Sequence, residues 1–117
     1  MLFGMTPTET MRSYFENWNA RDFDAFQSLL AEEVSFRGPL GTADGPRECR
    51  AGVEGMSRGL DARAEIVTML GDGHEVITWF ELHTNAAAPV AVANYAQVRD
   101  GKVVAIRAAF DPRPLLD

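Results

Sequence analysis

The sequence lacks the features that mark membrane proteins, disulfide-stabilised proteins and nucleic-acid-binding domains. No apolar run reaches the roughly 20 residues that a membrane-spanning helix needs, and a single cysteine, Cys49, cannot form an internal disulfide. The 11 Lys and Arg residues are outnumbered by 17 Asp and Glu, whereas phosphate binding depends on clustered cations. We therefore expect a cytoplasmic protein that binds neither membranes nor nucleic acids.

The first ten residues, MLFGMTPTET, also lack the basic and apolar regions of a secretory signal peptide. Residues 1–5 are expected to form a flexible N-terminal extension. The composition, 46% hydrophobic and 24% charged, is that of an ordinary globular protein, and 117 residues are enough for one core but not for two. We predict a single domain over residues 1–117.

Two helix-start signals occur in the first quarter of the chain. Thr6 to Glu9 reads Thr-Pro-Thr-Glu, which supplies a cap, a proline at the first helical position and a capping-box glutamate. A helix is therefore predicted from about Pro7 to Asn19, and Asp22 can cap a second, shorter helix. Helical spacing gives each helix one apolar face, made by Met11, Tyr14, Phe15 and Trp18 in the first and by Phe23, Phe26, Leu29 and Leu30 in the second.

A short strand and a loop rich in turn residues precede a third helix. Val34–Gly38 alternates apolar and polar residues, as a half-buried strand does, and Pro39 ends it because proline cannot donate to a strand ladder. The third helix is predicted to begin near Pro46. Its apolar stripe comprises Cys49, Val53, Met56 and Leu60. Three glycines at 52, 55 and 59 weaken this helix by about 1 kcal/mol each relative to alanine, unless they serve close packing against the sheet.

From Ala62 onward the pattern changes from helical to alternating. Turn signals at Gly71–Gly73, Asn85–Pro89 and Asp100–Gly101 divide the remaining chain into four segments. The predicted strands form an antiparallel meander of Ala62–Leu70, Glu75–Thr84, Val90–Arg99 and Lys102–Phe110. Helices first and strands later indicate an α+β domain, in which one curved antiparallel sheet packs against three N-terminal helices.

One amide interrupts the apolar faces of these strands. The inward sets are predicted to be Val76, Thr78, Phe80 and Leu82, then Val90, Val92, Asn94, Ala96 and Val98, and then Val104, Ile106, Ala108 and Phe110. An amide in an apolar row costs free energy unless it is hydrogen-bonded, so Asn94 predicts either a protein partner or a ligand. The small side chains of Ala96 and Ala108 leave room beside it, which favours a cavity over a filled core.

Two stretches of the sequence resemble a known group of proteins. These are YFENWNARDFDAFQSLLAEEVSFRGPLG, residues 14–41, and the closing hairpin DGKVVAIRAAF, residues 100–110. Together with the order of the elements, they resemble the ketosteroid isomerase and SnoaL-like polyketide cyclase group of the nuclear transport factor 2-like superfamily. The resemblance covers nearly the whole chain, and it implies a cone-shaped, cystatin-like fold with a pocket between the helices and the sheet.

The resemblance carries over only part of the ketosteroid isomerase site. In that enzyme a tyrosine of the first helix donates to the developing enolate oxygen, and Tyr14 matches it. A protonated aspartate on the penultimate strand supplies the second donor, and Ala96 stands there. The general base precedes a Pro-x-Gly turn, and here Gly38 precedes Pro39 and Gly41. Since proton abstraction beside a carbonyl needs a positioned base, the ordinary isomerase reaction is not predicted without a relocated one.

Three other residues are candidates for the missing acid or base. Glu81 and His83 lie two residues apart on one strand, where a carboxylate can orient an imidazole. They alternate with apolar residues, so they face outward unless the loop Asn85–Pro89 shifts the strand register by one residue. Asp111 follows the last strand, either as a turn residue or within reach of the pocket mouth.

The remaining reactive residues predict no metal or cofactor site. The two histidines, His74 and His83, are isolated, and no phosphate-binding glycine pattern follows a strand. Cys49 lies on an apolar helix stripe and is expected to be an inert buried thiol. We therefore expect chemistry, where there is any, that needs no cofactor.

The leading hypothesis is a protein that binds a small apolar molecule, polycyclic or terpenoid, in the cone. Tyr14 and Asn94 would donate to its carbonyl or enolate oxygen, and any catalysis would be of the isomerase, cyclase or hydrolase type, with His83, Glu81 or Asp111 moving the proton. Tyr14 is alternatively a core tyrosine. The residues expected to line the pocket are Trp18, Phe36, Gly38, Leu40, Val53, Met56, Phe80, Val92, Ala96, Ile106, Ala108 and Phe110.

The second hypothesis is a non-catalytic binding or dimerisation module. In that case the outer face of the sheet, with Tyr95, Gln97, Arg99 and Arg107, would form a homodimer interface. The family resemblance implies a homodimer under either hypothesis. A cavity of several hundred Å³ with convergent polar groups would favour the first hypothesis, and a fully packed interior the second.

Overall fold

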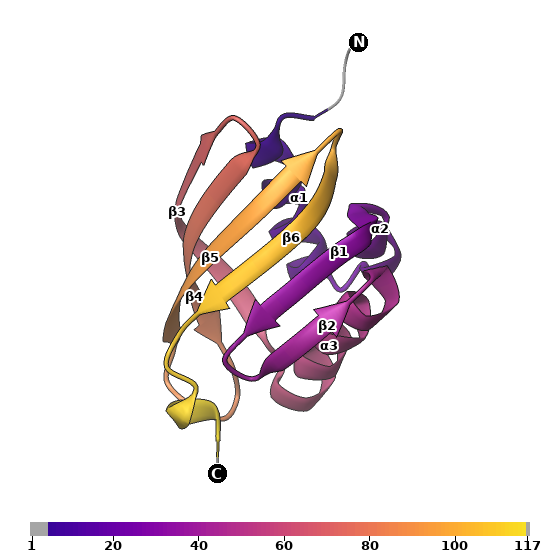
Figure 1. Cartoon of the computed structure of the whole chain (residues 1–117). Coiled ribbons are helices and arrows are strands. Elements are labelled where there is room, and N and C mark those ends of the chain that lie inside the picture. Colours follow the sequence, from indigo (N-terminus) through magenta and orange to yellow (C-terminus); the bar gives the residue numbers. More distant parts are fainter. Residues whose placement is uncertain (1–4, 117) are drawn as a thin grey trace.

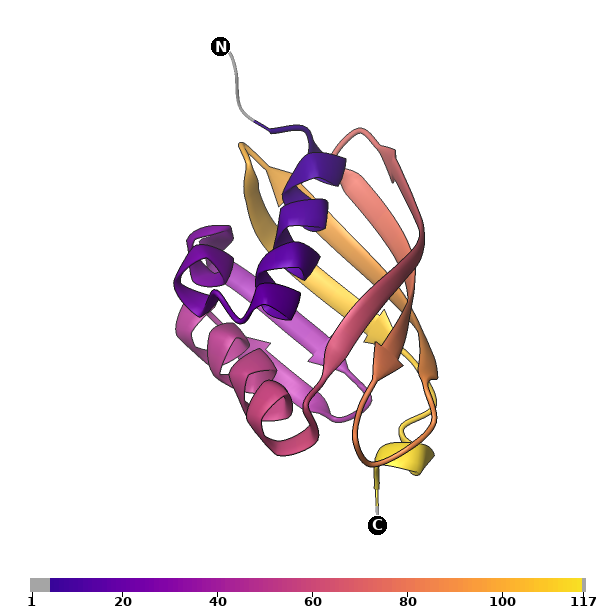
Figure 2. The ribbon, with the colours of Figure 1, turned by 180° about the vertical axis from the view of Figure 1, so that it is seen from behind.

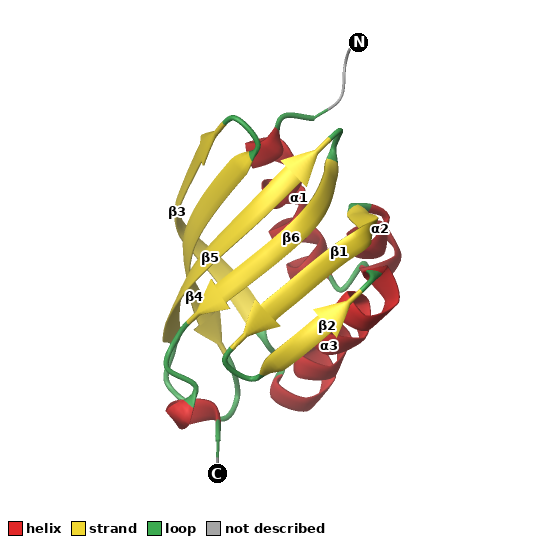
Figure 3. Cartoon of the chain, viewed as in Figure 1, coloured by secondary structure: helices red, strands yellow, loops and turns green. Residues whose placement is uncertain are grey.

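The computed structural model describes residues 5–116, and three helices cover one face of a six-stranded sheet (Figures 1 and 3). Apart from Met5, the expected N-terminal extension lies outside these residues. No helix in this range is long and apolar enough to span a membrane. The elements are α1 (Pro7–Ala20), α2 (Phe23–Ser28), β1 (Leu30–Gly38), β2 (Gly41–Asp44), α3 (Pro46–Leu60), β3 (Arg63–Asp72), β4 (Glu75–His83), β5 (Val90–Arg99), β6 (Lys102–Ala109) and a 3-10 turn, Arg113–Leu115.

The sheet has the strand order β2-β1-β6-β5-β4-β3. The four strands β3 to β6 form the predicted antiparallel meander. The expectation of a wholly antiparallel sheet is wrong in one place, because β1 runs parallel to β6 and makes the sheet mixed. Figure 2 shows the sheet curving around the helices, with α1 and α3 lying on the same face. The predicted α+β architecture is confirmed.

The glycine-rich stretch after β1 contains a strand that the sequence did not predict. β2 pairs with β1 through a tight turn, with Gly38 opposite Gly41 and Arg37 opposite Thr42. Its residues, Gly-Thr-Ala-Asp, are of the kind found in turns. Pairing and an ion pair hold the strand in place, since the guanidinium of Arg37 lies 3.0 Å from the Asp44 carboxylate.

The structure confirms the predicted start of α1, and hydrogen bonds attach the end of this helix to the rest of the fold. Thr6 and Glu9 form a capping box. At the other end Arg21 takes a left-handed conformation (φ 60°), and its guanidinium donates to the carbonyl of Ala62 (2.6 Å). The indole N–H of Trp18 donates to the same carbonyl (3.1 Å). These contacts fix α1 against the connection between α3 and β3.

The glycines of α3 do not serve close packing. A Cβ atom added at Gly52, Gly55 or Gly59 would meet no heavy atom within 4 Å. They therefore lower the stability of the helix without bringing it nearer to the sheet. The apolar stripe is nevertheless inward, since Cys49 and Val53 are buried.

The inward faces of β4 and β5 are as predicted, whereas that of β6 is shifted by a bulge. The alternate residues of β4 from Val76 to Leu82, and all five of β5 from Val90 to Val98, are buried. The prediction for Val104 is wrong, because the pairing with β5 skips it and places Val103, fully buried, opposite Val98. A bulge adds one residue to a strand and so reverses the alternation beyond it. Ile106 and Ala108 keep their predicted side.

Candidate functional site

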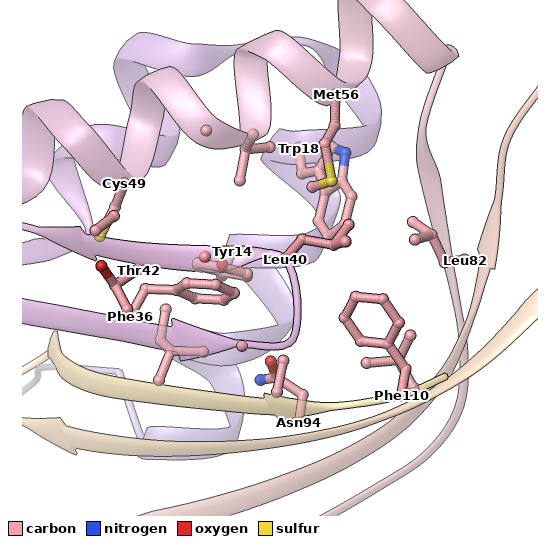
Figure 4. Close-up of a pocket in the computed structure, with 18 of the residues that line it drawn as sticks. Tyr14, Trp18, Phe36, Leu40, Thr42, Cys49, Met56, Leu82, Asn94 and Phe110 are labelled. Atoms are coloured by element: carbon pink, nitrogen blue, oxygen red, sulfur yellow. The ribbon is translucent and has the colours of Figure 1, made fainter. Parts of the chain in front are cut away.

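A cavity of about 470 Å³ lies between the helices and the concave face of the sheet. Its walls come from α1, α3 and every strand except β3, and they are mainly aliphatic and aromatic (Figure 4). All the residues expected to line the pocket lie in this wall except Ala96. The cavity reaches the surface between β2 and α3, where Leu40, Thr42 and Glu48 are exposed.

Ala96 is placed wrongly by the prediction. It is fully buried and belongs to the packed core, between Val76 and Ile106 in the sheet. It lies one inward position beyond Asn94 and does not line the cavity, although its neighbour Ile106 does. Strand periodicity identifies its face, but the packing of the helices determines where the cavity ends.

Tyr14 and Asn94 both lie in the cavity wall. Tyr14 comes from α1 and Asn94 from β5, and each is only 4% exposed (Figure 4). The Tyr14 ring packs edge-on against Phe15, with ring centres 5.0 Å apart. Burial, with a smaller contribution from Cys49, raises the pKa of the Tyr14 hydroxyl. This hydroxyl therefore stays protonated at neutral pH and can donate a hydrogen bond.

The amide of Asn94 is a buried polar group without a protein partner. Its Nδ2 atom is fully enclosed and makes no hydrogen bond to any residue that the structure describes. The residue lies opposite Thr78 on β4 and Ala108 on β6. A buried amide left unpaired costs about 1–3 kcal/mol.

The structure does not bring the candidate proton-transfer residues to the cavity. Leu82 pairs with Val90, so the register across the 85–89 loop keeps Glu81 and His83 on the outer face. There His83 Nε2 lies 2.8 Å from the Glu65 carboxylate on β3. Asp111 forms an ion pair with Arg113 (2.7 Å), and the hydrogen bonds from Arg113 lower its pKa to about 2. None of the three lies in the cavity wall.

Gly38 contributes space to the cavity. A Cβ atom at this position would lie 3.0 Å from the ring of Phe36 and 3.7 Å from Ala108. Its φ is not in the left-handed region, so the backbone does not require glycine there. The ring of Phe36 occupies the space that a side chain at the expected base position would need.

Two ionisable residues of the cavity wall, Cys49 and Glu48, were absent from the site residues predicted from the sequence. Cys49 was expected to be an inert buried thiol. It is buried, and it also lines the cavity. Burial, followed by the charges of Asp44 and Glu48, raises its pKa to about 11, so the thiol stays protonated at neutral pH. Glu48 precedes it at the cavity mouth. The sequence signal for Glu48 was its position next to Cys49, which belongs to the apolar stripe that faces the sheet. Within residues 5–116 no group of three His, Cys, Asp or Glu side chains could hold a metal ion.

Comparisons with known proteins agree with this architecture. Residues 11–106 match the family model of the SnoaL-like domain. The chain is similar to an NTF2-like protein of unknown function from Cytophaga hutchinsonii, with a TM-score of 0.87, 21% identity and 100% of each chain covered. It is similar to a candidate ketosteroid isomerase from Kribbella flavida (TM-score 0.81, 20% identity, 90% of this chain and 77% of that one).

A third similar structure is that of an LEH-like epoxide hydrolase from M. tuberculosis, with a TM-score of 0.80, 18% identity and 92% of this chain and 84% of that one covered. No curated protein sequence matches the chain. At these identities the three structures show a shared fold, and the residues of the cavity must be interpreted from their own chemistry.

Proposed function

Because the chain belongs to the SnoaL-like domain family, we propose that it binds a small apolar molecule in the cavity and donates hydrogen bonds to an oxygen of that molecule. Ligand sites are typically clefts of about 300–1,000 Å³ with mainly apolar walls and a few convergent polar groups. The present cavity, about 470 Å³ with Tyr14 and Asn94 in its wall, has these properties. The observation that supports the proposal best is the position of Asn94, a polar residue in the wall of a mainly apolar cavity, whose side-chain nitrogen has no partner among the described residues.

The two donors suit polarisation of a carbonyl or epoxide oxygen. Tyr14 stays protonated because burial raises its pKa, and an amide is neutral at every relevant pH. Neutral donors in an apolar site stabilise negative charge as it develops on oxygen. As an enzyme, the protein would therefore catalyse an isomerase, cyclase or hydrolase reaction without a cofactor. These reaction classes are named for similar structures. Among the described residues of the wall, only Glu48 supplies a carboxylate to accept a proton.

The tyrosine hydroxyl provides the first test. Replacing Tyr14 with phenylalanine is expected to weaken binding of a neutral probe ketone, 2-adamantanone, about three- to tenfold, which is the loss of one hydrogen bond. The dissociation constant can be measured by titration calorimetry. Tyr95→Phe is a matched control, because the Tyr95 hydroxyl bonds Glu75 on the outer face (2.6 Å). Equal effects of the two substitutions, or no binding by the unmodified protein, would contradict the proposal.

The outer face of the sheet favours a second function, homodimerisation. The predicted residues Tyr95, Gln97, Arg99 and Arg107 lie on this face. The structure adds an apolar cluster on β3 and β4 that the sequence analysis did not include: Leu70, Ile77 and Trp79, with exposed fractions of 68%, 47% and 47%. Exposed apolar groups that cluster on one face are typical of protein interfaces.

The charges on this face favour a second copy of the same chain as the occupant. Glu65 and Glu81 lie opposite one another on β3 and β4, and Arg107 lies beyond β5 on β6. A two-fold axis parallel to the strands would place the acidic side of one copy against the basic side of the other. Such an interface is isologous, the commonest arrangement in homodimers.

The dimer is tested by changing the apolar cluster. Trp79→Lys is expected to convert a dimer into a monomer in sedimentation velocity runs, because it places a charge among the apolar side chains of the proposed interface. Leu40→Lys is the matched control, since Leu40 is equally exposed (47%) but lies at the cavity mouth. A monomeric unmodified protein at concentrations around 100 μM, or a dimer that survives Trp79→Lys, would refute the interface.

We also propose a cytoplasmic location for the protein. The one cysteine is buried and its raised pKa keeps it in the unreactive thiol form. A chain without disulfides and with an unmodified thiol is suited to a reducing compartment.

A further inference from the structure

The wall of the cavity has an uneven distribution of charge. None of its lining residues is lysine, arginine or histidine, whereas Glu48 supplies a carboxylate. The deeper wall, with Trp18, Phe80 and Val92, carries no charge at all. Any charged group of a ligand would therefore meet only a negative partner, and only at the mouth.

The carboxylate of Glu48 has no cationic partner among the described residues. Its Oε1 atom accepts a hydrogen bond from the backbone N–H of Asp44 (2.8 Å), and within residues 5–116 it makes no ion pair. The nearby Arg37 is engaged by the Asp44 carboxylate at 3.0 Å. Arg47, the adjacent cation in the chain, does not line the cavity. Glu48 is exposed, so it faces both the cavity and the solvent.

We propose that Glu48 makes the cavity selective by charge, so that it prefers an apolar amine in its protonated form to a neutral compound of the same shape, and excludes the corresponding carboxylate. This inference rests on the proposed binding function and specifies the class of ligand. The apolar body of the ligand would fill the cavity, and its ammonium group would lie at the mouth beside Glu48.

The physical basis is the cost of leaving a charge unpaired in an apolar space. A carboxylate ligand would lose part of its hydration without gaining a cationic partner, and it would be repelled by Glu48. An ammonium group at the mouth keeps some hydration and gains a partly shielded ion pair. An oxygen in the body of the same ligand would still reach the buried donors Tyr14 and Asn94.

The test uses three probes with one skeleton: 1-adamantanamine, 1-adamantanol and adamantane-1-carboxylate. At pH 7 and 50 mM salt the amine is expected to bind about fivefold more tightly than the alcohol, which is the range of a partly exposed ion pair. The carboxylate is expected to bind more weakly than both. Raising the salt concentration to 500 mM should reduce the advantage of the amine, because salt screens exposed charges.

Glu48→Gln is the decisive variant, because glutamine can still accept the hydrogen bond from Asp44. It should abolish the preference, so that the variant binds the amine no more tightly than it binds the alcohol. Glu33→Gln is the matched control: it makes the same change in net charge at an exposed position on β1 that does not line the cavity. It should preserve the order of the three affinities.

The outcomes separate this inference from the proposal on which it rests. If none of the three probes binds the unmodified protein, the proposed binding function is overturned and the inference with it. If the alcohol binds but the amine binds no more tightly, or if Glu48→Gln leaves the order unchanged, the charge preference alone is overturned.

Discussion

Replacing Asn94 with leucine is expected to stabilise the protein and to weaken binding of 2-adamantanone in the same variant. The amide nitrogen of Asn94 is buried without a partner, and removing such a group recovers about 1–3 kcal/mol. For a domain of this size the midpoint of thermal unfolding should rise by about 4 °C per kcal/mol. The ketone should bind about tenfold less tightly, because it loses a buried donor. Calorimetry measures both quantities.

The adjacent strand provides the control. Thr78 lies opposite Asn94, is fully buried, and also has an unpartnered side-chain oxygen, but it does not line the cavity. Thr78→Val should therefore raise the unfolding midpoint and leave the affinity for the ketone unchanged. A fall in the unfolding midpoint of Asn94→Leu would show that the amide is satisfied in the free protein. Unchanged affinity would remove Asn94 from the binding site.

Truncation of Phe15 to alanine is expected to be the most destabilising single change, at about 3–5 kcal/mol. The ring is 1% exposed and lies at the centre of an aromatic cluster, with ring centres 5.0 Å from Tyr14 and Phe80 and 6.1 Å from Trp18. Its loss would leave a void between α1 and β4. Urea unfolding measures the change in the free energy of unfolding.

Phe110→Ala is the comparison for this truncation. Phe110 also lines the cavity, but it is only partly buried and follows the end of β6. Its loss should cost about 1 kcal/mol, because much of the ring already faces open space. If the two variants lost similar free energy, the helices would not be tightly packed on the sheet beside the cavity.

The elements that could be predicted from the sequence are those in which the local order of residues shows where the element begins or which side chains are buried. The capping box at Thr6 and the alternation in β4 and β5 reflect local rules, and the structure contains them as predicted. The strand β2 could not be predicted, because its four residues form a strand only through pairing with β1. The parallel pairing of β1 with β6 is likewise a long-range property that no local pattern specifies.

The same distinction applies to the cavity. Asn94 was identified because a polar residue interrupts an apolar row, and this signal lies within one strand. Ala96 is on the same face, but only the position of the helices separates it from the cavity. The place of Glu48 in the cavity wall was missed because its carboxylate is held by Asp44 of β2, a strand that the sequence did not predict. The outward placement of Glu81 follows from the alternation, once the strand register is fixed.

The place of β6 in the sheet determines when the cavity can form during folding. β6 is the last strand of the sheet, yet it lies between β1 and β5, so that Ser35 pairs with Ala105. Closing so long a loop is slow, because its entropy is lost before the contacts form. The walls of the cavity come from both sides of this junction, with Phe36 on β1 and Phe80 on β4. A growing chain therefore has no complete cavity wall until β6 has been synthesised.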